Sequence, residues 1–362
     1  MQPLRLLREI CSIPTAPFLE GRVIDYVQRF VARRPALKLR RDAAGNLLIE
    51  LRGRRPALPR WVFAAHMDHP GFVSRRMLDS RTLEADFRGS VRAEFVRGAA
   101  VRFFADDRQI AGRIIHVESE PDAPWARRAR IRVSREVPAD CIGMFDQGEG
   151  RIRGRRFHCR VCDNLAGVAA ALAMLQRLGR AAVDATIAVL LTRAEEEGFI
   201  GALAACQRPR LLRRSDRLIV IEASAAQPYA PLGAGPIIRV GDRTSIFNSS
   251  LTWFLSQQAQ SLAARRKGFL WQRALMGGGT CEATVYDLYG YRAASVCVAL
   301  GNYHNMDVRR RRIGAEFVDV DEWLGMVELF VAIARAAAEY RPDHSPLRRR
   351  LEERFERLRH LL

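Results

Sequence analysis

The sequence predicts an α/β protein in which helices cover both faces of a mostly parallel, mixed sheet, with a small β-barrel-like domain inserted into the chain. Two observations lead to this prediction. Near both ends of the chain, short apolar runs typical of buried strands alternate with segments of helical periodicity, as in proteins built around a parallel sheet. Residues 73–156 instead contain short alternating segments separated by turns. We therefore expect one domain from residues 1–72 and 157–362, and a second from 73–156.

The first part of the chain supplies a helix and the first strands. Helical spacing runs through residues 23–31, and the stretch "LKLRRDAAGNLLIEL" alternates around a turn at Gly45 and Asn46. Residues 61–65 form a short apolar run of the buried-strand type, and polar residues begin where this strand should end.

The part of the chain after the insert repeats strand and helix signals. A helix is predicted from Asp163, near an amino-terminal cap, to Gly179, near the carboxyl end. Further strands are predicted at 185–192, 216–224 and 293–301, and further helices at 249–266, 281–290 and 319–340. Alternation of this kind indicates a sheet with helices on both faces.

The last segment of the sequence, 346–362, has an apolar stripe at helical spacing. The stripe consists of Leu347, Leu351, Phe355, Leu358 and Leu362, with arginine and glutamate elsewhere. We expect this stripe to pack on the domain or on a sister subunit rather than on a membrane.

Composition excludes several classes of protein. The 362 residues are 48% apolar, with no run of about 18 apolar residues and no export signal at the amino terminus, so we expect a cytoplasmic protein without membrane contact. The net charge of +19 comes almost entirely from arginine spread along the chain, without zinc-finger spacing, and nucleic acid is not an expected partner. The seven cysteines show no disulfide framework, and the lone C-x-x-C at Cys159 and Cys162 is interpreted as structural.

Metal-binding residue types gather at the carboxyl ends of the predicted strands. They are His66 and Asp68, Glu195 and Glu196, Glu222, His304, and Asp163 at the start of a helix. This edge of an open α/β sheet is where ligands bind. Taken singly, His66 could be a core histidine and Asp163 a helix cap. Together, imidazoles and carboxylates at one edge are what two neighbouring divalent cations require.

Six short motifs resemble one family in their order. "AAHMDHPGF", "CDNLAGVAAALAML", "EEEGFIGA", "PLGAGPII", "GGGTCEA" and "NYH" follow one another as in the tetrahedral metallo-aminopeptidases. This co-catalytic group of the zinc peptidase-like hydrolases includes glutamyl and deblocking aminopeptidases. The resemblance runs from "SIPTAPFLEGRVIDYV" to His304. The long gap between His66 and Asp163 lies where this family carries its insert, whereas the carboxypeptidase-G and aminoacylase family carries its extra domain before the final histidine.

The resemblance implies a site for two divalent ions, with zinc expected first and cobalt or manganese as alternatives. His66 and Glu222 would bind one ion, Glu196 and His304 the other, and Asp163 would bridge the two. This set uses only imidazole and carboxylate ligands.

The resemblance also implies roles for residues that would not bind a metal. Glu195 would be the general base, taking a proton from the attacking water and passing it to the leaving amine. Asp68 would orient the imidazole of His66. Glu197, the third glutamate of the run, has no expected chemistry.

The sequence departs from the family pattern at several positions. The family usually has Asp where this chain has Glu222, commonly Glu where it has His69, and usually Asp where it has Cys281. No arginine directly precedes the "NYH" motif. These departures leave the metal spacing and the substrate contacts open.

The expected function is that of a metal-dependent aminopeptidase, which hydrolyses N-terminal residues from short peptides with a water activated by two metal ions. One alternative is a metal-dependent amidase or deacylase acting on N-acyl amino acids or related small amides. Another is a non-catalytic binding or assembly protein on a hydrolase fold. The resemblance further implies a homo-oligomer built from dimers, with a dodecamer as the family's characteristic assembly. In it the insert would contribute to dimerisation and assembly.

Overall fold

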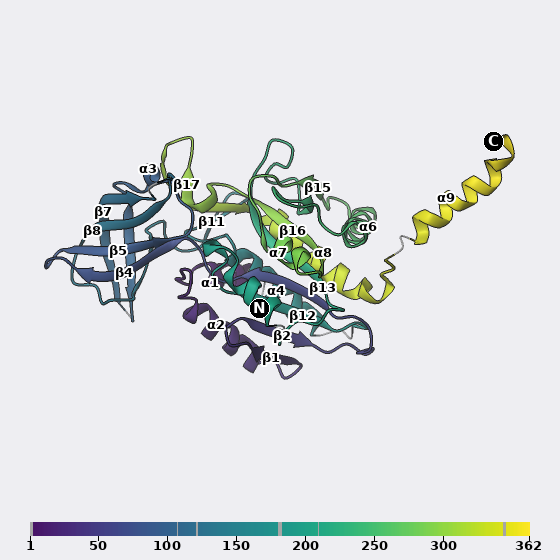
Figure 1. Ribbon diagram of the computed structural model, residues 1–362, viewed down its shortest axis with the longest axis horizontal. Coiled ribbons are helices and arrows are strands. Elements are labelled where there is room, and N and C mark those ends of the chain that lie inside the picture. Colours follow the sequence, from purple (N-terminus) through teal and green to yellow (C-terminus); the bar gives the residue numbers. More distant parts are fainter. Residues whose placement is uncertain (1–2, 107, 121, 180–182, 209, 343–344) are drawn as a thin grey trace.

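A mixed eight-stranded sheet forms the centre of the protein. The computed structural model describes residues 3–362 except 107, 121, 180–182, 209 and 343–344. In sheet order, the strands are β1 (Leu37–Arg41), β2 (Leu47–Leu51), β12 (Ile187–Thr192), β3 (Trp61–His66), β13 (Arg217–Ala225), β16 (Arg292–Leu300), β14 (Ile237–Gly241) and β15 (Gln272–Leu275) (Figure 1). β12, β3, β13 and β16 are parallel, β1–β2, β2–β12 and β14–β16 are antiparallel pairs, and β15 is parallel to β14. The predicted fold class is confirmed.

The central strands are buried on both faces. Along β3, Trp61, Phe63 and Ala65 enter one hydrophobic core, while Val62 and Ala64 enter the other. Successive side chains of a strand point to opposite faces, so a strand between two cores needs an unbroken apolar run. This explains why residues 61–65 lack the alternation of a half-exposed strand.

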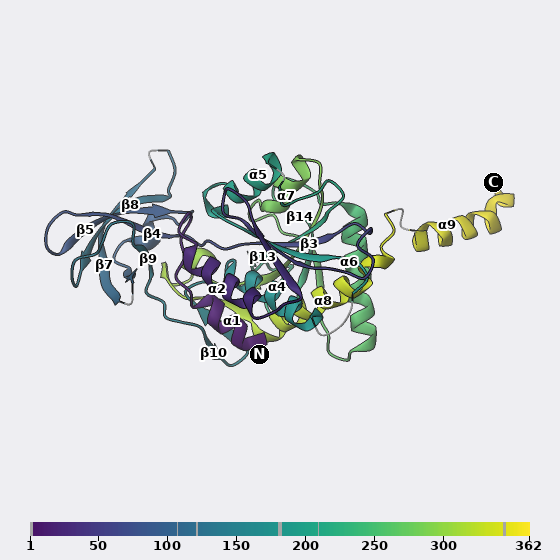
Figure 2. The same cartoon turned by 90° about the horizontal axis from the view of Figure 1, so that it is seen from below.

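Helices cover the two faces of the sheet. One core includes residues of α1 (Pro3–Cys11), α2 (Gly21–Ala32), α4 (Leu165–Leu178), α6 (Ser249–Arg265) and α8 (Val320–Ala336). The core on the opposite face includes residues of α5 (Ile200–Gln207) and α7 (Glu282–Leu288) (Figure 2). Asp319 caps α8 because its side chain accepts hydrogen bonds from the amides of Asp321 and Glu322.

The inserted segment contains a closed β-barrel with its own hydrophobic core. Its strands, in barrel order, are β4 (Gly71–Met77), β5 (Thr82–Arg88), β8 (Ala126–Val133), β7 (Arg108–Ser119), β6 (Ala100–Ala105) and β9 (Ile142–Phe145), and the short helix α3 (Ala93–Val96) lies between β5 and β6. Closure leaves no unpaired edge on this sheet. The domain division at residues 72/73 and 156/157 stays a prediction.

Short elements connect the barrel to the main sheet. β10 (Arg151–Arg153) pairs with β11 (Arg156–Cys159), which pairs with β19 (Glu316–Asp319). A two-stranded sheet is made of β17 (Met306–Asp307) and β18 (Arg312–Ile313). The 3₁₀ helices are η1 (Glu195–Glu197), η2 (Tyr303–Asn305), η3 (Ala337–Glu339) and η4 (Arg359–Leu361).

The helix α9 (Ser345–Leu358) stands apart from the rest of the fold. Figures 1 and 2 both show it projecting from the end of the main domain that is opposite the barrel. None of the helices in the described parts of the chain combines the length and apolar character needed to cross a membrane.

Candidate metal centre

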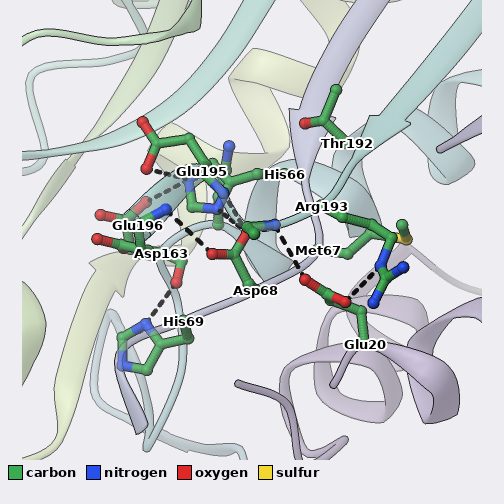
Figure 3. Close-up of polar contacts among 12 residues, drawn as sticks. Glu20, His66, Met67, Asp68, His69, Asp163, Thr192, Arg193, Glu195 and Glu196 are labelled. Atoms are coloured by element: carbon green, nitrogen blue, oxygen red, sulfur yellow. Dashed lines mark hydrogen bonds and ion pairs between the residues drawn. The ribbon is translucent and has the colours of Figure 1, made fainter. Parts of the chain in front are cut away.

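The predicted ligands and the predicted base meet at the carboxyl ends of the parallel strands. They come from the end of β3 (His66), from β13 (Glu222), from η1 after β12 (Glu195 and Glu196), from η2 after β16 (His304) and from the turn before α4 (Asp163). Parallel strands end at one edge of a sheet, so side chains distant in sequence converge there. Figure 3 shows four of them pointing toward one another.

Two groups of donor atoms result. His66, Glu195 and Glu222 form what we call the sheet-side cluster, and in it one donor atom of each residue lies within 4.8 Å of the others. Asp163, Glu196 and His304 form the barrel-side cluster, with donor atoms equally close. Each cluster has one imidazole and two carboxylates, a ligand set that suits zinc and similar divalent ions.

Asp163 lies between the two imidazoles. Its Oδ1 is 3.5 Å from Nε2 of His66, and its Oδ2 is 3.8 Å from Nε2 of His304. Nε2 of His66 also lies 3.8 Å from Oε2 of Glu222, and Nε2 of His304 lies 3.0 Å from Oε1 of Glu196. One carboxylate therefore faces both clusters.

The donor atoms are buried and short of partners. Asp163, Glu222 and His304 are 4%, 6% and 2% exposed. Among the described residues, Oδ1 of Asp163 and Oε1 of Glu222 have no hydrogen-bond partner. Buried polar atoms normally have a partner, and a divalent cation would supply one to each of these atoms. The residues present therefore fit the metal ions that the sequence predicts.

Burial shifts the pKa values of the two adjacent glutamates in opposite directions. Burial raises the pKa of Glu195 well above its usual range, although the neighbouring His66 opposes this. Burial acts on Glu196 in the same way, but His304 outweighs it and lowers the pKa of Glu196. At neutral pH Glu195 holds a proton more readily than Glu196 does.

The barrel-side cluster attracts protons when no cation is bound. Burial raises the pKa of Asp163 to about 7, against the opposing effect of His66. Burial lowers the pKa of His304, but Glu196 and Asp163 outweigh burial and raise it to about 9. A cation at this cluster would have to displace a proton from His304 at neutral pH.

Asp68 does more than the sequence indicated. Its Oδ1 lies 3.4 Å from Nδ1 of His66, and its orienting role stays a prediction. The same carboxylate accepts hydrogen bonds from the backbone amides of Glu195 and Glu196, both at 3.0 Å. Asp68 thus ties the end of β3 to the turn that carries the predicted base.

Glu20 and Arg193, which the sequence analysis missed, hold the start of that turn (Figure 3). The buried carboxylate of Glu20 accepts hydrogen bonds from the amide of Ala194 at 2.9 Å and from Nε of Arg193 at 2.6 Å. Ala194 has φ of 49°, a left-handed conformation that non-glycine residues rarely adopt. The Glu20 bond offsets the cost of this conformation.

Glu316 was also missed, although it supports the segments that carry two of the three barrel-side ligands, Asp163 and His304. Its Oε2 accepts hydrogen bonds from the amides of Cys162 and Asp163 at 2.6 and 3.0 Å, and its Oε1 accepts one from the amide of His304 at 2.9 Å. In the sequence, Glu316 could have been noticed as a glutamate at a position of a strand that faces the interior. The sequence does not indicate which segments its carboxylate would connect.

The barrel domain contacts one predicted ligand, His304, and the turn that carries Glu195 to Glu197. Nδ1 of His304 lies 2.9 Å from the carbonyl oxygen of Ser90, in the connection after β5. Oε1 of Glu197 accepts a hydrogen bond from the amide of Gly89 at 2.6 Å and lies 3.7 Å from a guanidinium nitrogen of Arg127. Glu197 therefore links the turn of the predicted base to the inserted barrel.

Two residues that depart from the family pattern are buried. Nδ1 of His69 lies 2.6 Å from the carbonyl oxygen of Asp163, and its Nε2 lies 3.1 Å from Oδ1 of Asn305. His69 thus braces the backbone of Asp163. Cys281 lines the cavity that is also lined by the three residues of the sheet-side cluster and by Asp163 and Glu196 of the barrel-side cluster.

That cavity has a volume of about 100 Å³ and carries one cationic side chain on its wall. Arg239 is 3% exposed, and its Nε has no hydrogen-bond partner among the described residues. A larger cavity of about 530 Å³, bordered by α1 and α2, contains none of the predicted site residues. The site chemistry therefore lies in the smaller cavity.

Solved structures resemble this fold closely. The aminopeptidase APDkam598 from the archaeon Desulfurococcus kamchatkensis superposes with a TM-score of 0.77 at 22% identity, over 94% of this chain and 96% of that chain. The TET1 peptidase of Pyrococcus horikoshii gives a TM-score of 0.75 at 20% identity, over 92% and 99%. The TET aminopeptidase of Thaumarchaeota archaeon SCGC AB-539-E09 gives 0.76 at 16% identity, over 92% and 97%.

Sequence comparison identifies the family. A search of curated protein sequences found no significant match. The model of the M42 glutamyl aminopeptidase family, in contrast, matches residues 45–312, a span that includes both clusters. The chain is therefore a peptidase of the M42 glutamyl aminopeptidase family, which confirms the resemblance seen in its sequence.

Proposed function

We propose that the chain removes N-terminal residues from short peptides with one divalent ion bound at each cluster. The observation that carries the proposal is the placement of Asp163, whose two oxygens face His66 at 3.5 Å and His304 at 3.8 Å. Such a carboxylate is suited to bridge two ions. His66 and Glu222 would complete the ligands of one ion, and Glu196 and His304 those of the other.

Glu195 is the proposed general base. Its raised pKa and the lowered pKa of Glu196 support a division of labour in which one carboxylate exchanges a proton and the other stays charged. Divalent ions, when bound, would polarise the peptide carbonyl and make water more acidic. Glu195 would accept the proton of the attacking water and return it to the leaving amine.

We further propose that the substrate presents a carboxylate to Arg239. This guanidinium lies on the wall of the same cavity as the sheet-side cluster, Asp163 and Glu196. It is nearly fully buried, and its Nε has no hydrogen-bond partner among the described residues. The carboxylate could belong to an acidic first residue or to the carboxyl end of a very short peptide. Peptides with neutral first residues and amidated ends distinguish these two sources.

Self-association is also proposed, with the barrel contributing contacts. The Pyrococcus horikoshii TET1 peptidase is described as assembling into a tetrahedron or a large octahedral shell. Leu78 and Ile115, on strands or turns of the barrel here, are 42% and 48% exposed. A twelve-subunit assembly built from dimers is the specific form to test.

A substrate panel tests the reaction. Aminoacyl anilides and di- to tetrapeptides with free amino termini are compared with N-acyl amino acids, each after chelation and after addition of zinc, cobalt or manganese. We expect hydrolysis of the free-amine substrates only when metal is restored. Preference for the acylated compounds would replace the aminopeptidase proposal with that of an amidase. A folded protein that binds no metal and cleaves nothing would favour a binding or assembly role.

A further inference from the structure

The helix α9 carries an apolar stripe that faces solvent. Every residue from Arg348 to Leu362 is exposed, and both overall views show α9 away from the main domain. Along the stripe, Leu351, Phe355, Leu358 and Leu362 are 58%, 54%, 39% and 101% exposed. Of the two predicted alternatives, packing on its own domain is therefore not seen for the stripe from Leu351 to Leu362, and packing on a sister subunit stays a prediction.

A helix of this kind needs a partner. α9 has 14 residues, a length at which isolated helices are marginal in water. Leu351, Phe355 and Leu358 on α9, together with Leu362 after η4, are spaced four, three and four positions apart, which is the repeat of the apolar seam in a two-stranded coiled coil. A matching helix would bury these side chains.

We propose that α9 pairs in antiparallel orientation with α9 of a second copy of this chain. The charges beside the stripe select both the partner and its direction. With Phe355 packed against the partner's Leu358, an antiparallel pair sets Glu352 opposite the partner's Arg359, and symmetry creates this contact twice. A parallel pair instead brings Arg354 against the partner's Arg359, where the like charges repel.

Contacts within α9 and between α9 and η4 leave these charges available. Glu352 accepts a hydrogen bond from Arg348 at 2.7 Å, and Arg359 lies 3.0 Å from Glu356. All four side chains are about 60% exposed or more. Exposed pairs of this type contribute about 0–1 kcal/mol, so they exchange readily for contacts across a dimer.

A membrane is the other surface that an amphipathic helix can bind. Helices that lie on anionic membranes have a polar face rich in lysine and arginine. In α9 that face includes Glu352, Glu353 and Glu356 among its arginines. The interleaved acidic residues fit a protein partner of the same mixed charge better than an anionic lipid surface.

The pairing is tested by sedimentation of the full chain over a range of concentrations. Phe355→Arg should halve the mass of the largest species that the unchanged chain forms. Glu353→Arg adds the same side chain on the opposite face of α9 and should leave that mass unchanged. Neither variant touches the metal clusters, and the readout requires no hydrolytic activity, so failure of the proposed function would not affect the result.

Charge reversal tests the direction. Arg359→Glu should raise the dissociation constant several-fold, and combining it with Glu352→Arg should restore pairing, because the antiparallel contact is then recreated with exchanged signs. Tighter association of Arg359→Glu would show parallel pairing and overturn the orientation. An unchanged mass for Phe355→Arg, together with Phe355-dependent binding to vesicles of phosphatidylcholine and phosphatidylserine, would replace the second copy with a membrane.

Discussion

The two metal-ligand clusters use similar side chains but are held in different ways. In the sheet-side cluster, His66 and Glu222 belong to β3 and β13, which are adjacent parallel strands. Their positions follow from backbone pairing. In the barrel-side cluster, Asp163, Glu196 and His304 lie outside the strands of the main sheet and are held by side-chain bonds to the backbone.

This difference indicates where the site is vulnerable. Hydrogen bonds between the backbones of paired strands do not depend on any one side chain. In contrast, the single side chain of Glu316 accepts hydrogen bonds from the segments that carry two of the barrel-side ligands. The barrel adds a second support, since the carbonyl of Ser90 contacts His304 and the amide of Gly89 contacts Glu197. We therefore expect the barrel-side cluster to depend on the inserted domain more than His66 and Glu222 do, since these two ligands lie on paired strands.

The largest effect should come from Glu195→Gln. If Glu195 is the base rather than a ligand of the sheet-side cluster, turnover falls by about 10²- to 10⁴-fold. The metal content should stay at two ions per chain, as measured by atomic emission after dialysis. Loss of one ion would instead make Glu195 a ligand.

Glu316→Gln should weaken the barrel-side cluster selectively. Partners that orient metal ligands typically contribute roughly 10- to 100-fold in metal affinity or activity. Calorimetric titration of the metal-free chain should show one weakened site and one unchanged site. Glu322→Gln is the matched control, because Glu322 is also buried and also accepts hydrogen bonds from backbone amides, those of Gly233 and Ala299, neither of which is a predicted metal ligand. Equal weakening of both sites by Glu316→Gln would contradict the separate support of the two clusters.

Metal removal should make stability fall as the pH rises. In the metal-free chain the pKa of His304 is raised from 6.5 to about 9, so the folded state holds a proton that the unfolded state releases. This contribution is complete below about pH 6.5 and is lost as the pH rises through 9. The melting temperature of the chelated chain should therefore be lower at pH 9 than at pH 6.5, and zinc should reverse the drop.

The control for this pH effect is His304→Gln, which removes the titrating group. The pH-dependent difference in melting temperature should shrink in this variant when both proteins are free of metal. If the difference is unchanged, the titration belongs to other buried groups such as Glu282, whose pKa burial raises to about 8.

The smallest effect should come from Glu197→Gln. This change weakens the bond to the Gly89 amide and the ion pair with Arg127, while Glu195 and Glu196 remain in place. One hydrogen bond of this kind contributes about 1–3 kcal/mol, and only part of that loss reaches the reaction. We expect a decrease in kcat of less than about tenfold at constant metal content, with Arg127→Gln giving a smaller decrease. A loss as large as that of Glu195→Gln would give Glu197 a direct role.

The sequence by itself determined the order of strands and helices, the barrel-like insert and the residues that gather in the site. These features have local signatures. Burial on both faces of β3 requires an apolar run, and the polar residues after each such run lie at one edge of a parallel sheet. Family motifs then distinguish a di-metal peptidase from other proteins with this architecture.

Only the tertiary structure decided how the ligands group and what supports them. Glu20, Glu316 and Glu197 accept hydrogen bonds from amides 174, 153 and 108 positions away, respectively. The tertiary structure also shows that the apolar stripe of α9 is exposed, although the spacing of the stripe would equally suit a helix packed on the domain. A periodic pattern of apolar residues indicates which face of a helix or strand packs against another surface. Which surface that is depends on how distant segments of the chain meet when it folds.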